Sequence, residues 1–191
     1  MAGSRQICAV LAVASVVAGC HRNATPPAPS PVGAELRAAQ PSYPVDTAPK
    51  LTIALRNNGT QACSLPSIAD GSVEVVSVQR DGVAVIGRPG RESLLGGLAE
   101  VVAQSLRSVA PGESISVPLD VEISSHGSPI LRTSRQTATD DARLVGWLLD
   151  QPGKYRVTAQ LVAVTGVQRP DLPPMCPVAG TSATAEFQVT K

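Results

Sequence analysis

The chain has 191 residues, with 16 basic and 15 acidic side chains and a formal net charge of +1. This balance excludes the strongly basic surface that binding to nucleic acid or to anionic lipid would need. Aromatic residues make up only 2% of the chain, so the core must be built from valine, leucine, isoleucine and alanine. Beyond an N-terminal segment about 160 residues remain, enough for one domain with its own core.

The first residues of the chain predict export. Arg5 precedes an apolar run from Ile7 to Ala18, and small residues stand directly before Cys20. This order is typical of a secretory signal peptide. The apolar run is too short for a transmembrane helix, because a hydrocarbon core of ~30 Å requires about 20 residues. We therefore expect residues 1–19 to be a removable signal peptide.

The tetrapeptide Val17-Ala18-Gly19-Cys20 resembles the lipobox of bacterial lipoproteins. The resemblance implies that Cys20 becomes the first residue of the mature chain and carries a thioether-linked diacylglycerol and an acylated amine. More than one acyl chain gives stable attachment to a membrane, at ~0.8 kcal/mol for each buried CH₂ group. His21 stands where an aspartate tends to retain such a protein at the inner membrane. The resemblance therefore favours the periplasmic face of the outer membrane if the host is diderm.

A proline-rich stretch follows the cysteine. Residues 22–31 contain no aromatic residue and cannot bury a core, so we expect an extended tether. At ~3.1 Å per residue it would reach about 30 Å from the bilayer. The predicted organisation is a signal peptide over 1–19, a lipidated cysteine and tether over 20–33, and one domain over 34–191.

Beyond the tether, apolar and polar residues alternate with a period of two, which predicts β-strands. The clearest run is 113–123, in which Pro118 cannot donate to a ladder and so indicates an edge or a bulge. The run that starts at Val73 changes phase at Val75-Val76, which indicates a bulge or a strand buried on both faces. Asp81-Gly82 predicts a tight hairpin turn. Other strands are expected near 34–39, 51–56, 83–86, 155–163 and 183–189.

Two segments leave the secondary structure open. Residues 91–109 fit a helical stripe as well as a strand, but Gly96-Gly97 argues against a long helix. We expect a loop or a short helix there, followed by a strand near 101–107. Residues 141–149 are compatible with a strand or with one helical turn.

About seven short strands separated by turns predict an all-β fold, an antiparallel β-sandwich. The segment Asp150-Gln-Pro-Gly-Lys-Tyr155 resembles the tyrosine corner of immunoglobulin-like and fibronectin-like domains. The resemblance implies an immunoglobulin-like sandwich in which the phenol of Tyr155 binds backbone upstream. Val157 departs from antibody domains, which have their second core cysteine at this place.

The four cysteines divide by position. Cys8 leaves with the signal peptide and Cys20 is the lipid site. Cys63 and Cys176 remain as an even pair in an oxidising compartment, which predicts a disulfide. The alternative is a two-thiolate metal site, for which neither histidine nor further cysteine supplies the other ligands.

No catalytic set is evident among the residues of the domain. His126 lies in Ser124-Ser-His-Gly-Ser128, where a Ser/His pair for acyl transfer is far less expected than a solvated turn. Asp140-Asp141 lacks the further oxygen ligands of a calcium site and is expected to cap a helix or lie exposed. Gly87-Arg88-Pro89-Gly90, followed by Gly96-Gly97, lacks the Gly-Lys-Ser/Thr of a phosphate loop. We expect no enzyme activity, no cofactor and no metal.

The segment 124–146 is expected to be a long loop that interrupts the sandwich, and such loops are usually functional or disordered. The predicted function is that of a noncatalytic, lipid-anchored envelope protein that binds an envelope protein or a glycan and no nucleic acid. The alternative is a proteinase inhibitor that acts through 124–146 or 87–100. In their order, the segments 55–60, 78–82, 110–114 and 151–155 also resemble small bacterial proteinase-inhibitor sandwiches and the noncatalytic sandwich that precedes some deuterolysin-like metalloproteases.

Overall fold

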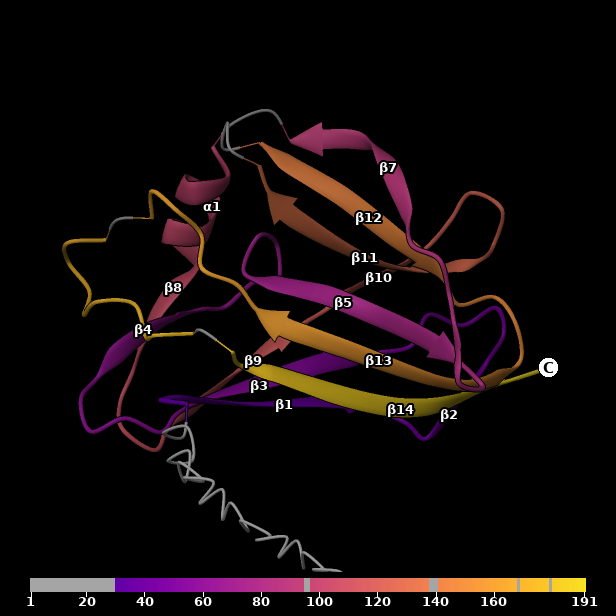
Figure 1. Cartoon of the computed structure of the whole chain (residues 1–191), viewed down its shortest axis with the longest axis horizontal. Coiled ribbons are helices and arrows are strands. Elements are labelled where there is room, and N and C mark those ends of the chain that lie inside the picture. The colour runs from indigo at the N-terminus through magenta and orange to yellow at the C-terminus, as the bar shows by residue number, and fades with distance from the viewer. Residues whose placement is uncertain (1–29, 95–96, 138–140, 168, 179) are drawn as a thin grey trace, which may run out of the picture.

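A computed structural model describes residues 30–94, 97–137, 141–167, 169–178 and 180–191 (Figure 1). The signal peptide, Cys20, the tether as far as residue 29 and Asp140 lie outside the described residues. The described chain consists mostly of strands, with one short helix, which confirms the all-β class. The elements are β1 (Val32–Ala38), β2 (Ser42–Pro44), β3 (Leu51–Asn57), β4 (Cys63–Pro66), β5 (Val73–Arg80), β6 (Val83–Ala84), β7 (Arg88–Leu94), α1 (Leu98–Ser105), β8 (Leu106–Val109), β9 (Ser114–Pro118), β10 (Asp120–Ile123), β11 (Pro129–Gln136), β12 (Ala142–Leu148), β13 (Gly153–Leu161) and β14 (Ser182–Thr190).

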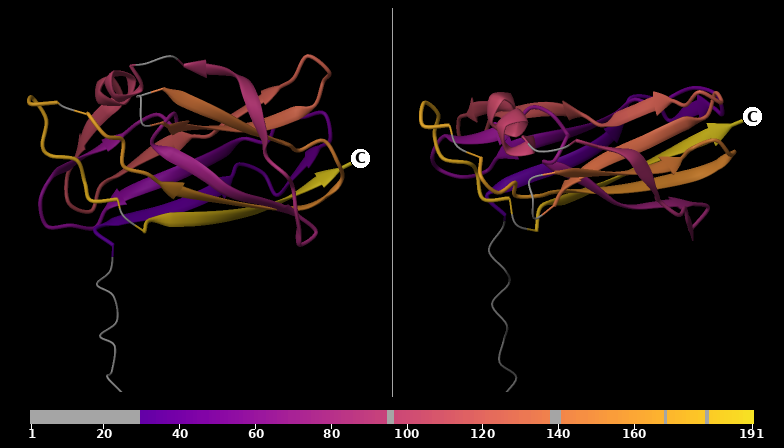
Figure 2. Two further views of the ribbon diagram at one scale, coloured as in Figure 1. Left: turned by 45° about the horizontal axis from the view of Figure 1, so that its top comes forward. Right: turned by 90° about the horizontal axis from the view of Figure 1, so that it is seen from above.

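The strands form several sheets around one main apolar core. A five-stranded sheet has the order β2-β14-β13-β5-β6, a three-stranded sheet β1-β3-β9, a four-stranded sheet β10-β11-β12-β7 and a two-stranded sheet β4-β8. The three-stranded sheet lies behind β13 and β14, so the two layers face each other (Figures 1 and 2). The core between the sheets includes Leu36, Ile53, Leu55, Val117, Leu131, Val157 and Phe187. This layered, sandwich-like arrangement follows from the alternation of inward apolar and outward polar residues along the strands.

The predicted strand over 113–123 changes partner at its proline. β9 pairs with β3, whereas β10 pairs with β11 in another sheet. Pro118 is the last residue of β9, and the Leu119 N–H donates to Leu51 O at 2.9 Å. Because proline has no N–H to give to a ladder, the strand can leave one sheet here and enter the next.

The β5 hairpin forms as its sequence predicts. Ser77 lies opposite Thr158 and Val75 opposite Ala159, so Val76 is the extra residue of a β-bulge. Its side chain is 44% exposed, while Val75 is buried. Asp81 and Gly82 both have positive φ and join β5 to β6, as a two-residue hairpin turn requires.

The expectation of a long loop over 124–146 is wrong. Most of the segment forms β11 and β12, which pair antiparallel as the centre of the four-stranded sheet. The inward face of β11 alternates an apolar residue with a hydroxyl, Leu131 with Thr133, and both are buried. The Thr133 Oγ1 donates to Val73 O at 2.9 Å and accepts from the Val75 N–H at 3.2 Å. Thr133 therefore hydrogen-bonds backbone groups of β5 from a core position that is usually aliphatic. Because this residue is polar, the alternation of apolar and polar residues that marks a strand is lost in the sequence.

Most of the described part of 87–100 likewise lies in β7 and at the start of α1, which is the short helix that the sequence left open. The expected strand near 101–107 is wrong over most of its length: α1 extends to Ser105, and the strand β8 begins at Leu106. Leu98 and Val102 of α1 pack with Ala142 and Val164 in a small second core. A helix forms here because Gly97, with a φ of 76°, lies at the N-cap and so does not interrupt the helix.

Strand boundaries differ elsewhere by a few residues. β1 begins at Val32, two residues before the predicted start of the domain, and Val32 is buried. The segment 141–149 is the strand β12 and not a helical turn. The short strands β2 and β4 were not predicted, because three or four residues are too few to show a period.

The predicted disulfide between Cys63 and Cys176 is confirmed, with a Cα–Cα distance of 5.0 Å, and excludes a two-thiolate metal site. It joins β4 to the segment between β13 and β14. Ser64 adds to this connection: its N–H donates to Pro174 O at 2.9 Å and its Oγ to Pro173 O at 2.7 Å. The long segment before β14 is thus held against β4 by a covalent bond and by hydrogen bonds.

Candidate functional site

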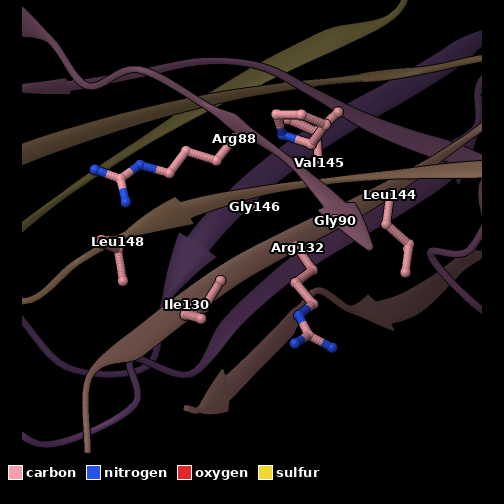
Figure 3. A pocket seen from close by; sticks show the side chains of 9 residues that line it. Arg88, Gly90, Ile130, Arg132, Leu144, Val145, Gly146 and Leu148 are labelled. Atoms are coloured by element: carbon pink, nitrogen blue, oxygen red, sulfur yellow. The ribbon is translucent and has the colours of Figure 1, made fainter. Parts of the chain in front are cut away.

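An open hollow of about 350 Å³ lies on the outer face of β7, β12 and β11. Leu131 and Trp147 of these strands turn into the core, with 0% and 7% of their surface exposed. Because side chains alternate along a strand, the residues on either side of them face outward. The outward residues Ile130, Arg132, Leu144, Gly146 and Leu148 line the hollow, together with Arg88, Pro89, Gly90 and Val145 (Figure 3).

Strand register places a glycine between two arginines at the centre of this hollow. Arg132 lies opposite Gly146, and Gly146 lies opposite Arg88 on the next strand. A Cβ atom on Gly146 would come within 3.0 Å of Ile130 Cγ2. Because Gly146 has no side chain, the sheet surface at this position is recessed and forms the floor of the hollow.

The walls of the hollow are aliphatic. Ile130 and Leu148 lie opposite each other on one side of Gly146 along the strands, and Leu144 lies on the other side of Gly146. All three are partly exposed, although they belong to a paired sheet. A sheet face of this kind is normally covered by another layer or carries polar residues. Here the described residues leave it open.

The two arginines differ in their partners. Arg132 forms an ion pair with Glu122 of the neighbouring strand β10. Among the described residues no carboxylate lies within ion-pair distance of Arg88, which is exposed. Figure 3 shows the two side chains leading away from each other. One side of the hollow thus has an available guanidinium, while the charge on the other side is neutralised.

A second hollow adjoins the first. Leu148 lines both, and the second is completed by Arg80, Val83, Ala84, Val85, Asp150, Gln151 and Tyr155. Val83 is 70% exposed and Ile86 is 83% exposed. These two residues extend the apolar surface from the hollow toward the β5–β6 turn.

Gly87 fixes the course of the chain between the two hollows. A Cβ atom at this position would lie 2.8 Å from Trp147 Cε2 and 2.9 Å from Val145 Cγ1. The backbone of residue 87 therefore passes directly over the indole, which leaves no room for a side chain. This close approach sets the start of β7, and with it the position of Arg88.

Tyr155 is a structural residue beside the second hollow. It is buried, and its ring stacks on Phe187 with a centroid distance of 5.7 Å. Burial raises the pKa of the Tyr155 phenol, against the lowering effect of a hydrogen bond with the Gln151 backbone and of the Arg80 guanidinium. Gln151 and Tyr155 both line the second hollow, at the turn between β12 and β13.

The other candidates from the sequence do not meet in one site. His126 is exposed in a turn closed by the Gly127 N–H, which donates to Ser124 O at 2.9 Å. Asp141 precedes β12. Over the described ranges, no group of three or more His, Cys, Asp or Glu residues is placed to hold a metal ion. No helix of the described chain is long and apolar enough to cross a membrane.

An acidic hollow lies at the start of β10. Asp70 and Asp120 line it together with Ser67, Ile68, Ala69, Pro118 and Leu119. Burial raises the pKa of the Asp120 carboxyl, and Glu122 adds to this effect while Arg132 opposes it. Asp70 accepts a hydrogen bond from Ser134 Oγ at 3.0 Å, which ties it to β11. The carboxylates of Asp70 and Asp120 therefore contribute to contacts where the sheets meet.

Comparison with family models, with curated proteins and with solved structures finds no match for this chain. The function must therefore be argued from the residues and geometry of the chain itself. The hollow on β7, β12 and β11 was not predicted from the sequence. Its one signal is the nearly continuous apolar run of β12, Leu144 to Leu149, which indicates a strand with both faces apolar.

Proposed function

We propose that this chain is a noncatalytic, lipid-anchored protein of the bacterial envelope whose domain binds a partner protein or glycan. The observation that carries the proposal is the open aliphatic hollow on the outer face of β7, β12 and β11. Contiguous apolar surface on a folded domain marks an interaction site, because its exposure to water is otherwise unfavourable. Nothing in this proposal requires a catalytic group.

The finer fold that we propose is immunoglobulin-like. Support comes from Tyr155 near the start of β13, which is buried, follows a Pro-Gly turn and lines the same hollow as Gln151 four residues upstream. This is the arrangement of a tyrosine corner. The disulfide differs from that of antibody domains, because it joins β4 to the segment before β14 at the periphery of the sandwich.

Membrane attachment through Cys20 is the second part of the proposal. It is supported by the lipobox-like tetrapeptide and by the proline-rich composition of the residues before β1. β1 begins at one end of the long axis, whereas β7 begins and β12 ends toward the other (Figures 1 and 2). In a domain anchored ahead of Val32, the hollow would therefore lie toward the end opposite the attachment point, where a partner at the periplasmic face of the outer membrane could reach it.

Inhibition of a proteinase is less well supported. An inhibitory loop has to stand clear of the domain, but most of 124–146 and 87–100 is hydrogen-bonded in β11, β12, β7 and α1. The described part of 124–146 outside strands is limited to the turns on either side of β11. The geometry therefore favours a binding surface over an inhibitory loop.

Replacement of the lipidation site tests the proposal in the producing bacterium. We expect the wild-type full chain in the membrane fraction and the Cys20→Ala variant in the soluble fraction or as an unprocessed precursor, because no acyl chain can be attached. A Cys8→Ala variant is the matched control, since it removes a cysteine but leaves the tetrapeptide Val17-Ala18-Gly19-Cys20 and the disulfide intact. Membrane association of a Cys20→Ala chain that lacks residues 1–19, equal to that of the wild type, would contradict the anchor.

Cross-linking of intact cells, followed by mass spectrometry, tests the binding role. We expect an adduct between the full chain and an envelope component that is reduced in the Cys20→Ala variant, because the anchor raises the local concentration of the domain at the membrane. An absence of adducts for the wild-type chain would contradict a binding function.

A further inference from the structure

We propose that the outer face of β7, β12 and β11 is a docking site for an acidic, aliphatic segment of a partner protein. This inference rests on the proposed binding function and specifies its surface and its ligand chemistry. The segment would place a bulky apolar side chain over Gly146 and a carboxylate against Arg88. The docking surface comprises the two hollows that meet at Leu148, together with Val83 and Ile86.

The shape of the surface argues for a protein segment and against an enclosed small molecule. The first hollow has about 350 Å³, at the lower end of the ~300–1,000 Å³ typical of small-molecule pockets, which surround most of their ligand. This hollow is open and continues past Leu148 into the second. Leu144, Gly146 and Leu148 alone extend over about 13 Å along β12, at ~3.4 Å per residue. An elongated, shallow and aliphatic track fits a stretch of polypeptide.

The guanidinium of Arg88 favours an acidic partner segment. Arg132 is already paired with Glu122, so a ligand gains little from that side. The guanidinium of Arg88 has no carboxylate partner among the described residues and is exposed beside the aliphatic floor. Guanidinium and carboxylate groups form charge-assisted, often bidentate hydrogen bonds. An Asp or Glu close to a large apolar residue would satisfy both features at once.

The partner is expected to lie on the sheet face and not to extend the sheet. β7 is an outer strand, but Pro89 has no N–H for a new ladder. The register between β7 and β12 also shifts between Arg143 and Val145, and such an irregular edge disfavours addition of a further strand. Affinity must therefore come from side-chain contacts with the hollow.

A photo-crosslinking amino acid at position 130 of the full chain, expressed in the producing bacterium, tests the site. The matched control carries the same amino acid at Thr184, which is exposed on β14 in another sheet. We expect position 130 to yield an adduct with a segment of another protein that contains an Asp or Glu near an aliphatic or aromatic residue. Position 184 should not yield that adduct.

Two substitutions in the chain labelled at position 130 test the ligand chemistry. Arg88→Glu reverses an exposed charge, and we expect it to reduce the yield of the adduct by about ten-fold or more; Arg88→Lys should retain much of it. Gly146→Val fills the floor, and we expect a comparable loss. Adducts only with lipid or with a second copy of the chain would overturn the site, as would an adduct that Arg88→Glu leaves unchanged.

Failure of this site can be distinguished from failure of the proposed function. Partner adducts at position 184 without any at position 130 would reject the docking surface and leave the binding function intact. An absence of partner adducts at both positions, and from chemical cross-linking of the wild-type chain, would reject both.

Discussion

Removal of the disulfide, by replacing Cys63 and Cys176 together with alanine, is expected to lower the free energy of unfolding by about 4–5 kcal/mol. The bond joins residues 113 positions apart, and a cross-link that closes a loop of ~100 residues restricts the unfolded chain by about this amount in the chain-entropy model. The free energy of unfolding is to be measured by urea titration of the oxidised full chain and of the double variant.

Reduction provides the control for this experiment. Wild-type protein titrated with a reductant should approach the double variant, because both lack the covalent link. The reductant should leave the double variant unchanged. A loss of less than 1 kcal/mol in the double variant would contradict the role of the bond and would indicate that the contacts of Ser64 with Pro173 and Pro174 suffice.

Truncation of Phe187 is expected to lower the free energy of unfolding by about 3–5 kcal/mol, as for other buried aromatic residues replaced by alanine. Phe187 is 3% exposed and connects two further rings of the core. Tyr155 stacks on it at 5.7 Å, and Tyr43 meets it edge-on at 5.8 Å. Truncation of Phe187 would therefore leave a cavity and remove the ring contact of both tyrosines.

Two matched variants separate the packing of Phe187 from general effects on β14. Phe187→Leu retains most of the volume and should cost clearly less than Phe187→Ala. Gln188→Ala alters an exposed neighbour on the same strand and should change stability by less than about 0.5 kcal/mol. Similar losses for Phe187→Ala and Gln188→Ala in chemical denaturation would contradict the central position of the ring.

Elements whose local pattern agrees with their tertiary environment were predictable from the sequence. The alternation in 51–56 corresponds to β3, whose residues Leu51, Ile53 and Leu55 are buried. The phase change at Val75-Val76 corresponds to the bulge of β5. The even pair of cysteines corresponds to the disulfide. Period, turn chemistry and cysteine count are local or compositional signals, so one sequence is enough to read them.

Elements stabilised by contacts distant in sequence were not predictable. Thr133 is buried because it bonds the edge of β5, and Ser134 because it accepts from the Gly71 N–H at 2.8 Å. Such hydroxyl contacts give β11 a polar sequence, which made the segment resemble a loop. The helix α1 is stabilised by Val164, which is distant in sequence and belongs to the same apolar cluster as Leu98 and Val102. The local sequence does not contain this contact and therefore left helix and strand both open.

The candidate docking surface depends on strand register and could not be read from the sequence. Arg88, Arg132 and Gly146 are far apart in the chain and meet only because β7 and β11 pair with the two sides of β12. Which of the two arginines has a carboxylate partner likewise depends on register, which places Glu122 beside Arg132. A composition rich in arginine relative to lysine gives no indication of which side chain is left available.

The proposed lipid anchor at Cys20 would decide where the domain acts. Its most direct test is mass spectrometry of the N-terminal peptide of the protein purified from the membrane fraction. We predict a peptide that begins at Cys20 and carries a diacylglycerol on the thiol and an acyl group on the amine. A chain that retains residues 1–19, or a peptide with an unmodified Cys20, would contradict it.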